Sequence, residues 1–161
     1  RRRGAAELRV ARQYRQRDAR GWLIVDGSVT AHPDLCQDRQ VIGIVKSHET
    51  LFLEGEDLET ALTLPAGHRS SAFAPRFERG GPVHSWYLRL WPREGEDIFH
   101  GLIRVERYGH APADASDADA VSGWLLAERA PMSTPDSRWD RLLYPIHRVE
   151  ELLRAQAGTW S

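Results

Sequence analysis

The sequence predicts an α/β fold, a sheet with helices packed on it, formed by a single domain over residues 1–161. Short apolar runs that are typical of strands are mixed along the chain with segments of helical spacing, rather than segregated from them. The length of 161 residues and the hydrophobic content of 41% are sufficient for one hydrophobic core.

The N-terminal part is expected to form one helix and two strands. Residues 5–17 contain no Pro or Gly and carry apolar side chains at helical spacing, which predicts a helix. Residues 22–25 (WLIV) and 41–45 (VIGIV) are short, continuous apolar runs, as in strands covered on both faces. We therefore expect both to be central strands.

The middle of the chain is expected to form a short helix and a hairpin. Residues 51–53 extend or pair with the second strand, and a helix over residues 56–64 ends at Pro65. Residues 83–91 (VHSWYLRLW) and 98–108 (IFHGLIRVERY) are strand-like runs joined by PREGED. This arrangement predicts a β-hairpin.

The C-terminal part is expected to be mainly helical. A helix over residues 120–130 follows a polar loop, with Asp117 or Asp119 available to cap its N-terminus. The short segment 139–144 precedes Pro145, which opens a last helix over residues 146–157.

Several classes of protein lose their usual support. No GxGxxG, Walker loop, GxSxG or HExxH motif is present, so dinucleotide, P-loop, serine hydrolase and zincin chemistry are not indicated. The single Cys36 excludes an internal disulfide and a multi-cysteine zinc site, which is typical of a reducing compartment. The sequence shows no signal peptide and no apolar run long enough to span a bilayer, so we expect a cytoplasmic protein without a membrane partner.

The charge is unevenly distributed although the net charge is only −1. Residues 1–20 carry eight arginines, among them Arg9 and Arg12, whereas residues 54–59 (EGEDLE) are acidic. The basic segment is suited to binding phosphates. The alternative is a solvated helix face in an arginine-rich sequence.

Two acids and the only lysine stand where an active site is expected. Asp26 ends the first strand, Glu7 lies on the preceding helix, and Lys46 directly follows the second strand. Active residues of α/β folds collect where strands end. Carboxylates that converge there suit Mg²⁺ or Mn²⁺, and a lysine beside them would hold a phosphate.

Each of these residues also has a structural interpretation. Asp26-Gly27 is a common hairpin turn, although the next strand does not follow at the two-residue spacing. Glu7 alone is an ordinary solvated helix residue. Lys46 alone is typical of a residue that protects an edge strand from aggregation.

The order of these motifs resembles the NurA nucleases. The shared order is a helix with Glu7, an apolar strand ending in Asp-Gly-Ser, the strand VIGIVKS, and a Tyr-Pro pair followed by an amphipathic helix. The resemblance covers most of this chain but only the C-terminal part of the family's domain. It implies an RNase H-like mixed sheet flanked by helices that lacks its N-terminal strands here, together with the family's first metal-binding aspartate.

The resemblance also implies an activity and a set of residue roles. Family members are Mn²⁺-dependent nucleases that act on DNA ends, form homodimers and work with HerA-type hexameric ATPases in DNA repair or antiphage defence. Asp26 and Glu7 match metal ligands of the family, for Mn²⁺ or Mg²⁺, and Tyr144 matches the tyrosine of the Tyr-Pro motif. His147 would position water or the leaving group, although it lies nearer to Tyr144 than the family's histidine does.

The expected reaction is hydrolysis of a DNA phosphodiester by metal-activated water. Lys46 would neutralise a phosphate at the site. Arg9 and Arg12 would follow the DNA backbone through contacts that are independent of sequence and sensitive to salt.

Two further classes compete with this hypothesis. A non-catalytic module that binds nucleic acid or docks on an ATPase would use Trp86, Tyr87 and Trp91 of the hairpin as an interface. The alternative for that hairpin is a core position for Trp86, Leu88 and Leu90. A carboxylate-based glycosidase needs two acids around a sugar cleft, and Lys46 favours phosphate over sugar.

Overall fold

The computed structural model describes residues 2–31, 35, 37–75, 82–93, 95, 97–109 and 115–129. The elements in this part of the chain are α1 (Arg2–Arg17), β1 (Leu23–Asp26), the 3-10 helix η1 (Val29–Ala31), β2 (Val41–Val45), α2 (Gly55–Leu62), β3 (Val83–Arg89), β4 (Leu102–Tyr108) and α3 (Ala115–Ala127). The protein therefore combines helices with a sheet, as the sequence predicts.

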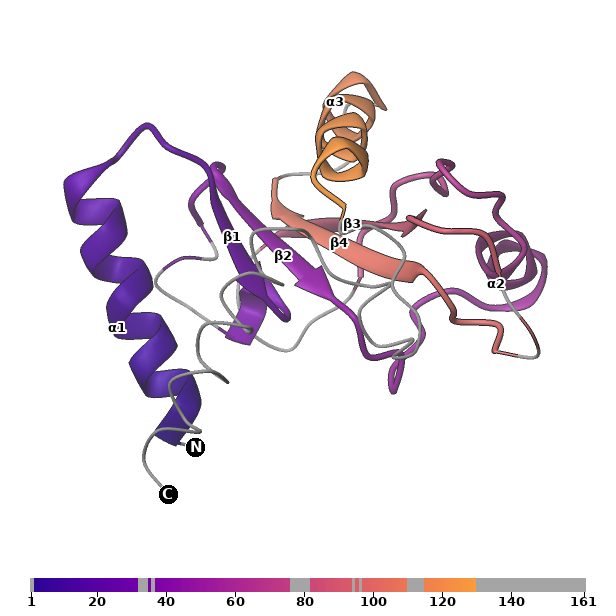
Figure 1. Ribbon diagram of the computed structural model, residues 1–161, viewed down its shortest axis with the longest axis horizontal. Helices are drawn as coiled ribbons and strands as arrows, with labels where there is room; N and C mark the ends of the chain where they lie inside the picture. Colours follow the sequence, from indigo (N-terminus) through magenta and orange to yellow (C-terminus); the bar gives the residue numbers. More distant parts are fainter. Residues whose placement is uncertain are drawn as a thin grey trace.

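The four strands form one mixed sheet in the order β1-β2-β4-β3. β1 and β2 are parallel, whereas β4 is antiparallel to both β2 and β3. A parallel pair requires the chain to cross back between its strands, and η1 lies in that connection. α1 and α2 lie at opposite ends of the molecule, and α3 lies over one face of the sheet (Figure 1).

The face of the sheet under α3 is mainly apolar, with the polar side chains of His84 and Arg107 at one end. Every second residue of a strand points to the same face, so this face collects alternate side chains of β2, β3 and β4. Trp86 is fully buried there, and its indole Nε1 donates a 2.9 Å hydrogen bond to Ser122 Oγ on α3. The buried members of this cluster are Ile42, Ile44, Trp86, Leu88, Leu90, Ile103, Val105, Ala118, Val121 and Leu125.

The opposite face of the sheet has two smaller apolar clusters. One includes Val25, Val41 and Val83, and Ala11 of α1 packs against it. The other includes Tyr87 and Leu102 near α2. The register places the charged residues 104 and 106 of β4 between these clusters on the same face.

α1 is attached to the sheet through Arg15. The Arg15 guanidinium donates to the Asp38 carboxylate at 2.8 Å and 2.5 Å and to the Gly21 carbonyl oxygen at 2.6 Å. These groups flank the start of β1 and β2, so one side chain fixes the helix relative to both strands. Both donors share one carboxylate oxygen, Oδ2 of Asp38, and charge-assisted contacts of this kind are the stronger class of hydrogen bond.

The hairpin and the early elements are confirmed. β3 pairs with β4 as the two apolar runs predict, and β2 is buried along its whole length. The core interpretation of Trp86 and Leu88 is also confirmed, because both are fully buried, and Tyr87 is buried too. An interface role for Trp86 and Tyr87 is therefore wrong.

Three expectations are corrected. Within the described residues β1 is an edge strand rather than a central one, since only β2 pairs with it. Residues 51–53 form no strand. α3 begins at Ala115, earlier than expected, so Asp117 and Asp119 lie inside its first turns rather than at a capping position. The expected elements at 139–144 and 146–157 lie outside the described residues.

Candidate functional site

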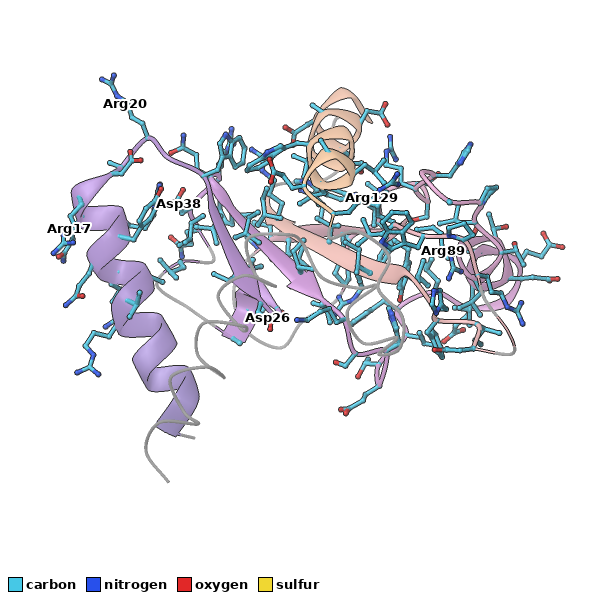
Figure 2. The ribbon with its side chains drawn as sticks, viewed as in Figure 1. Arg17, Arg20, Asp26, Asp38, Arg89 and Arg129 are labelled. Carbon is cyan, nitrogen blue, oxygen red and sulfur yellow. The ribbon has the colours of Figure 1, made fainter. Side chains whose placement is uncertain are left out.

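Asp26 and Lys46 meet at the carboxyl ends of the two parallel strands. Asp26 is the last residue of β1, and Lys46 directly follows β2. The Lys46 ammonium Nζ lies 2.9 Å from Asp26 Oδ2. The Asp26 side chain remains 44% exposed and that of Lys46 22%, so the pair is accessible from solvent (Figure 2 labels Asp26).

This pairing decides between the interpretations of the two residues. Asp26-Gly27 is not a hairpin turn, because β1 and β2 are parallel. Lys46 follows an internal strand, so protection of a sheet edge does not explain it. The sequence-based expectation that the acid and the lysine lie together is confirmed by their distance.

The loop after Asp26 depends on two glycines. Gly27 has φ of +116°, a backbone conformation that side chains disfavour. Gly43 on β2 gives the loop room to cross, since a Cβ added there would lie 2.7 Å from the Gly27 carbonyl oxygen. The Gly27 N–H donates to the Ile44 carbonyl at 2.8 Å, which continues the β1–β2 ladder by one step.

Glu106 of β4 receives this loop, and sequence reasoning missed it. Its Oε2 accepts hydrogen bonds from Ser28 Oγ at 2.6 Å and from the Val29 N–H at 3.0 Å. Its Oε1 lies 2.5 Å from Arg104 Nη1. Glu106 is 0% exposed, and a buried carboxylate is stable only with such partners. The available signal was an Arg and a Glu two residues apart in an apolar strand, which places both on one face.

The other predicted residues lie on α1 or outside the described residues. Glu7 lies on α1, which packs through Ala11 against the Val25 side of β1. Arg9 and Arg12 are exposed on α1. Tyr144 and His147 lie outside the described residues.

The fit to a divalent cation rests on one carboxylate. Asp26 is accessible and presents the hard oxygen ligands that Mg²⁺ and Mn²⁺ prefer. Among the described residues, no group of three His, Cys, Asp or Glu side chains is placed to hold a metal ion. Asp26 would therefore be one ligand of such an ion.

A second polar cluster lies at the other end of the sheet, under α3. The Arg107 guanidinium is ion-paired with the Asp117 carboxylate, and His84 Nε2 lies 4.0 Å from the same carboxylate. Burial lowers the pKa of His84; Asp117 opposes this shift and Arg107 adds to it. The Arg107 guanidinium also lies 4.8 Å from the ring centroid of Trp22. The cluster joins the start of α3 to β3 and β4.

Arg89 is a buried cation that binds backbone carbonyl groups. It is fully buried at the end of β3 and donates to Leu62 O at 2.6 Å and Leu64 O at 3.3 Å, where α2 ends. It also donates to the carbonyl oxygens of Ile98 and His100, before β4. A cation at a helix C-terminus is favourable because the unpaired carbonyl groups carry partial negative charge. Arg89 thus fixes two connections.

Burial raises the pKa of the Tyr87 phenol on the same face as Glu106, while the Phe52 backbone and the Arg104 charge act in the opposite direction. The Arg104 guanidinium itself lies 4.5 Å from the ring centroid of Phe52. Arg104 is therefore held between an aromatic ring and Glu106, an arrangement that restricts the guanidinium.

No protein-family model matches the chain, and no curated protein matches it either. No helix in the described ranges combines the length and the hydrophobicity needed to cross a bilayer.

Proposed function

We propose that this protein is a metal-dependent deoxyribonuclease of the NurA type, built on an RNase H-like sheet, which hydrolyses phosphodiester bonds from DNA ends. The observation that carries the proposal is the accessible Asp26 carboxylate at the carboxyl edge of two parallel strands, 2.9 Å from the only lysine of the chain. An acid beside a cation at this edge suits a phosphate ester.

In this proposal each side chain of the pair has its own task. Mn²⁺ or Mg²⁺, when bound, would activate water and stabilise the leaving oxygen. Asp26 would provide a ligand, with Glu7 as a second. Lys46 would leave its ion pair with Asp26 and neutralise a phosphate oxygen. Because its ammonium group is held beside Asp26, it is already close to the position that the substrate phosphate would take. Tyr144 and His147 would position water or the leaving group.

The proposed partners follow from the resemblance to the NurA nucleases. The protein would act as a homodimer in the cytoplasm, with a HerA-like hexameric ATPase, in DNA repair or antiphage defence. Arg9 and Arg12 on the exposed side of α1 would contact the DNA backbone, which makes binding strongly dependent on salt.

The experiment is a cleavage assay with the full-length protein on linear single- and double-stranded DNA, in Mn²⁺, Mg²⁺ or EDTA. Cleavage that requires metal and is lost in Asp26→Asn supports the proposal. Asp57→Asn is the matched control, because Asp57 is an exposed acid on α2, away from the parallel strands. Equal cleavage by wild type and Asp26→Asn, or no cleavage in any metal, would overturn it.

A second candidate is a non-catalytic module that binds nucleic acid or docks on an ATPase. One observation favours it: arginines of α1, among them Arg9 and Arg12, are exposed. This candidate predicts salt-dependent DNA binding in EDTA that is weakened in Arg9→Gln and Arg12→Gln but unchanged in Asp26→Asn. Binding without cleavage would favour the module over the enzyme.

A further inference from the structure

Glu106 occupies a place in the sheet where an apolar side chain is expected. It is 0% exposed, in the middle of β4, and its neighbours across the sheet are Gly43 of β2 and Ser85 of β3. Burying a carboxylate costs several kcal/mol before its partners are counted. A residue of this kind in a packed sheet therefore needs an explanation beyond packing.

The hydrogen-bonding partners of Glu106 belong to the loop that follows Asp26. Ser28 Oγ and the Val29 N–H both donate to Oε2, and Ser28 Oγ is also 2.7 Å from Thr30 Oγ1. Arg104 neutralises the other carboxylate oxygen from the same strand. One buried anion thus binds Ser28 and Val29 of the loop that begins at Gly27, and Ser28 in turn contacts Thr30.

The strand that carries Asp26 depends on such an attachment. β1 has only four residues and, in the described part of the chain, pairs with β2 alone. The ends of short edge strands open easily, because few hydrogen bonds must break. The side chain of Asp26 lies on the face of the sheet under α3, whereas Glu106 lies on the opposite face. The loop after Asp26 therefore crosses over Gly43 on that opposite face, where Glu106 binds it.

From these contacts we infer that Glu106 is a positioning residue for Asp26: through Ser28 and Val29 it fixes the carboxyl end of β1 and thereby holds the Asp26 carboxylate beside Lys46. The catalytic consequence rests on the proposed function, since it matters for cleavage only if Asp26 is a metal ligand. The positioning itself does not depend on that function.

The sole lysine makes the positioning measurable without any assay of activity. In the 161-residue chain labelled with ¹³C,¹⁵N-lysine, every side-chain lysine signal in the NMR spectrum comes from Lys46. Asp26→Asn gives the reference signal of Lys46 without its carboxylate partner. We expect Ser28→Ala and Glu106→Gln to move the Lys46 signal toward that reference, and Ser28→Thr, which keeps the hydroxyl, to restore it.

The control separates positioning from loss of stability. Leu125→Ala removes a fully buried side chain of α3 but leaves Ser28 and Glu106 in place, so it should lower the stability of the fold without moving the Lys46 signal. If the Lys46 signal stays at its wild-type position in folded Ser28→Ala protein, the inference is overturned. Ser28→Ala keeps the test decisive even if Glu106→Gln does not fold.

Activity is the second measurement. In metal-dependent cleavage we expect Ser28→Ala to lower kcat by about tenfold to a hundredfold with KM for DNA unchanged, because the site is misplaced while DNA contacts remain. A Lys46 signal that moves while wild-type protein cleaves no DNA would retain the inference and reject the proposed function. Cleavage by the wild type, together with an unmoved Lys46 signal in the variants, would support the proposed function and overturn the inference.

Discussion

The face of the sheet under α3 is filled mainly by aliphatic and aromatic side chains, with His84 and Arg107 at one end, whereas the opposite face buries Arg89, Arg104 and Glu106 from the same strands. Apolar burial is not directional and tolerates rearrangement. Charged hydrogen bonds require partners at defined positions. The first face therefore supplies cohesion, and the second determines which loops lie against the sheet and where.

The largest effect is expected at Arg89. Arg89→Met keeps the apolar part of the side chain but leaves the carbonyl oxygens of Leu62, Leu64, Ile98 and His100 without this donor, which should cost about 3–5 kcal/mol in the free energy of unfolding. The measurement is urea denaturation. The matched variant is Leu88→Ala, a cavity on the α3 face at the adjacent position, with an expected cost of about 2–5 kcal/mol.

Arg89→Met and Leu88→Ala should also differ in which segments of the protein lose protection from hydrogen exchange. Hydrogen exchange in Arg89→Met should accelerate in α2 and around residues 98–100, whereas Leu88→Ala should affect the sheet and α3 together. Equal protection in both variants would contradict a directional role for the charged face.

The next effect concerns the buried ion pair. Glu106→Gln leaves the Arg104 guanidinium buried without its anion, so we expect a loss of about 3 kcal/mol. Adding Arg104→Met should return part of that loss, because the uncompensated charge is removed. A double-mutant cycle by urea denaturation should give a coupling of about 1–3 kcal/mol. Simple additivity of the two changes would show that the pair is not coupled.

A smaller effect is expected from His84 on the α3 face. Burial lowers the pKa of His84 in the folded state, so on acidification the unfolded chain takes up this proton first. Stability should therefore fall as the pH drops below about 6.5, toward the lower folded pKa, by at most about 1.4 kcal/mol per pH unit. Urea denaturation between pH 7 and pH 5.5 measures this slope.

His84→Gln should flatten that dependence, because the variant has no proton to bind at this position. Asp117 and Arg107 stay in place as the neighbouring charges. An unchanged slope in the variant would assign the pH dependence to other groups.

The smallest change in stability is expected at the candidate site itself. The Asp26–Lys46 pair is partly exposed, and such pairs contribute between zero and about 1 kcal/mol. Asp26→Asn should thus unfold within about 1 kcal/mol of the wild type by thermal or urea denaturation. A loss above about 2 kcal/mol would mean that Asp26 is a structural residue like Glu106.

Sequence patterns were sufficient to predict the apolar strands of this molecule. Continuous apolar runs predicted β2 and the β3–β4 hairpin, because burial on both faces leaves no alternation of polar residues. Strand ends predicted that Asp26 and Lys46 would lie together. The order of the strands could not be predicted in the same way. The edge position of β1 depends on which other strand pairs with β2, and a local sequence pattern carries no information about that pairing.

The roles of the buried charged residues could not be predicted from the sequence for a related reason. The roles of Glu106 and Arg89 come from partners that are distant in sequence, such as Ser28 for Glu106 and Leu62 for Arg89. Their local signal is a charged residue in an apolar strand, which is equally typical of a solvent-facing position. Departures from the hydrophobic pattern are expected where a protein fixes a site.

The pairing of β4 with its two neighbours also has a kinetic consequence. Within the hairpin, Ser85 Oγ bonds Val105 O across 20 residues, whereas the Ser28–Glu106 bond closes 78 residues. The chain entropy lost in closing a loop grows with its length, so the hairpin should form early and the loop after β1 should dock late. Destabilising changes in the hairpin should mainly slow folding, while Ser28→Ala should mainly speed unfolding, as stopped-flow chevron plots would show. The segment that carries Asp26 would then be the last part of the sheet to assemble and the first to detach.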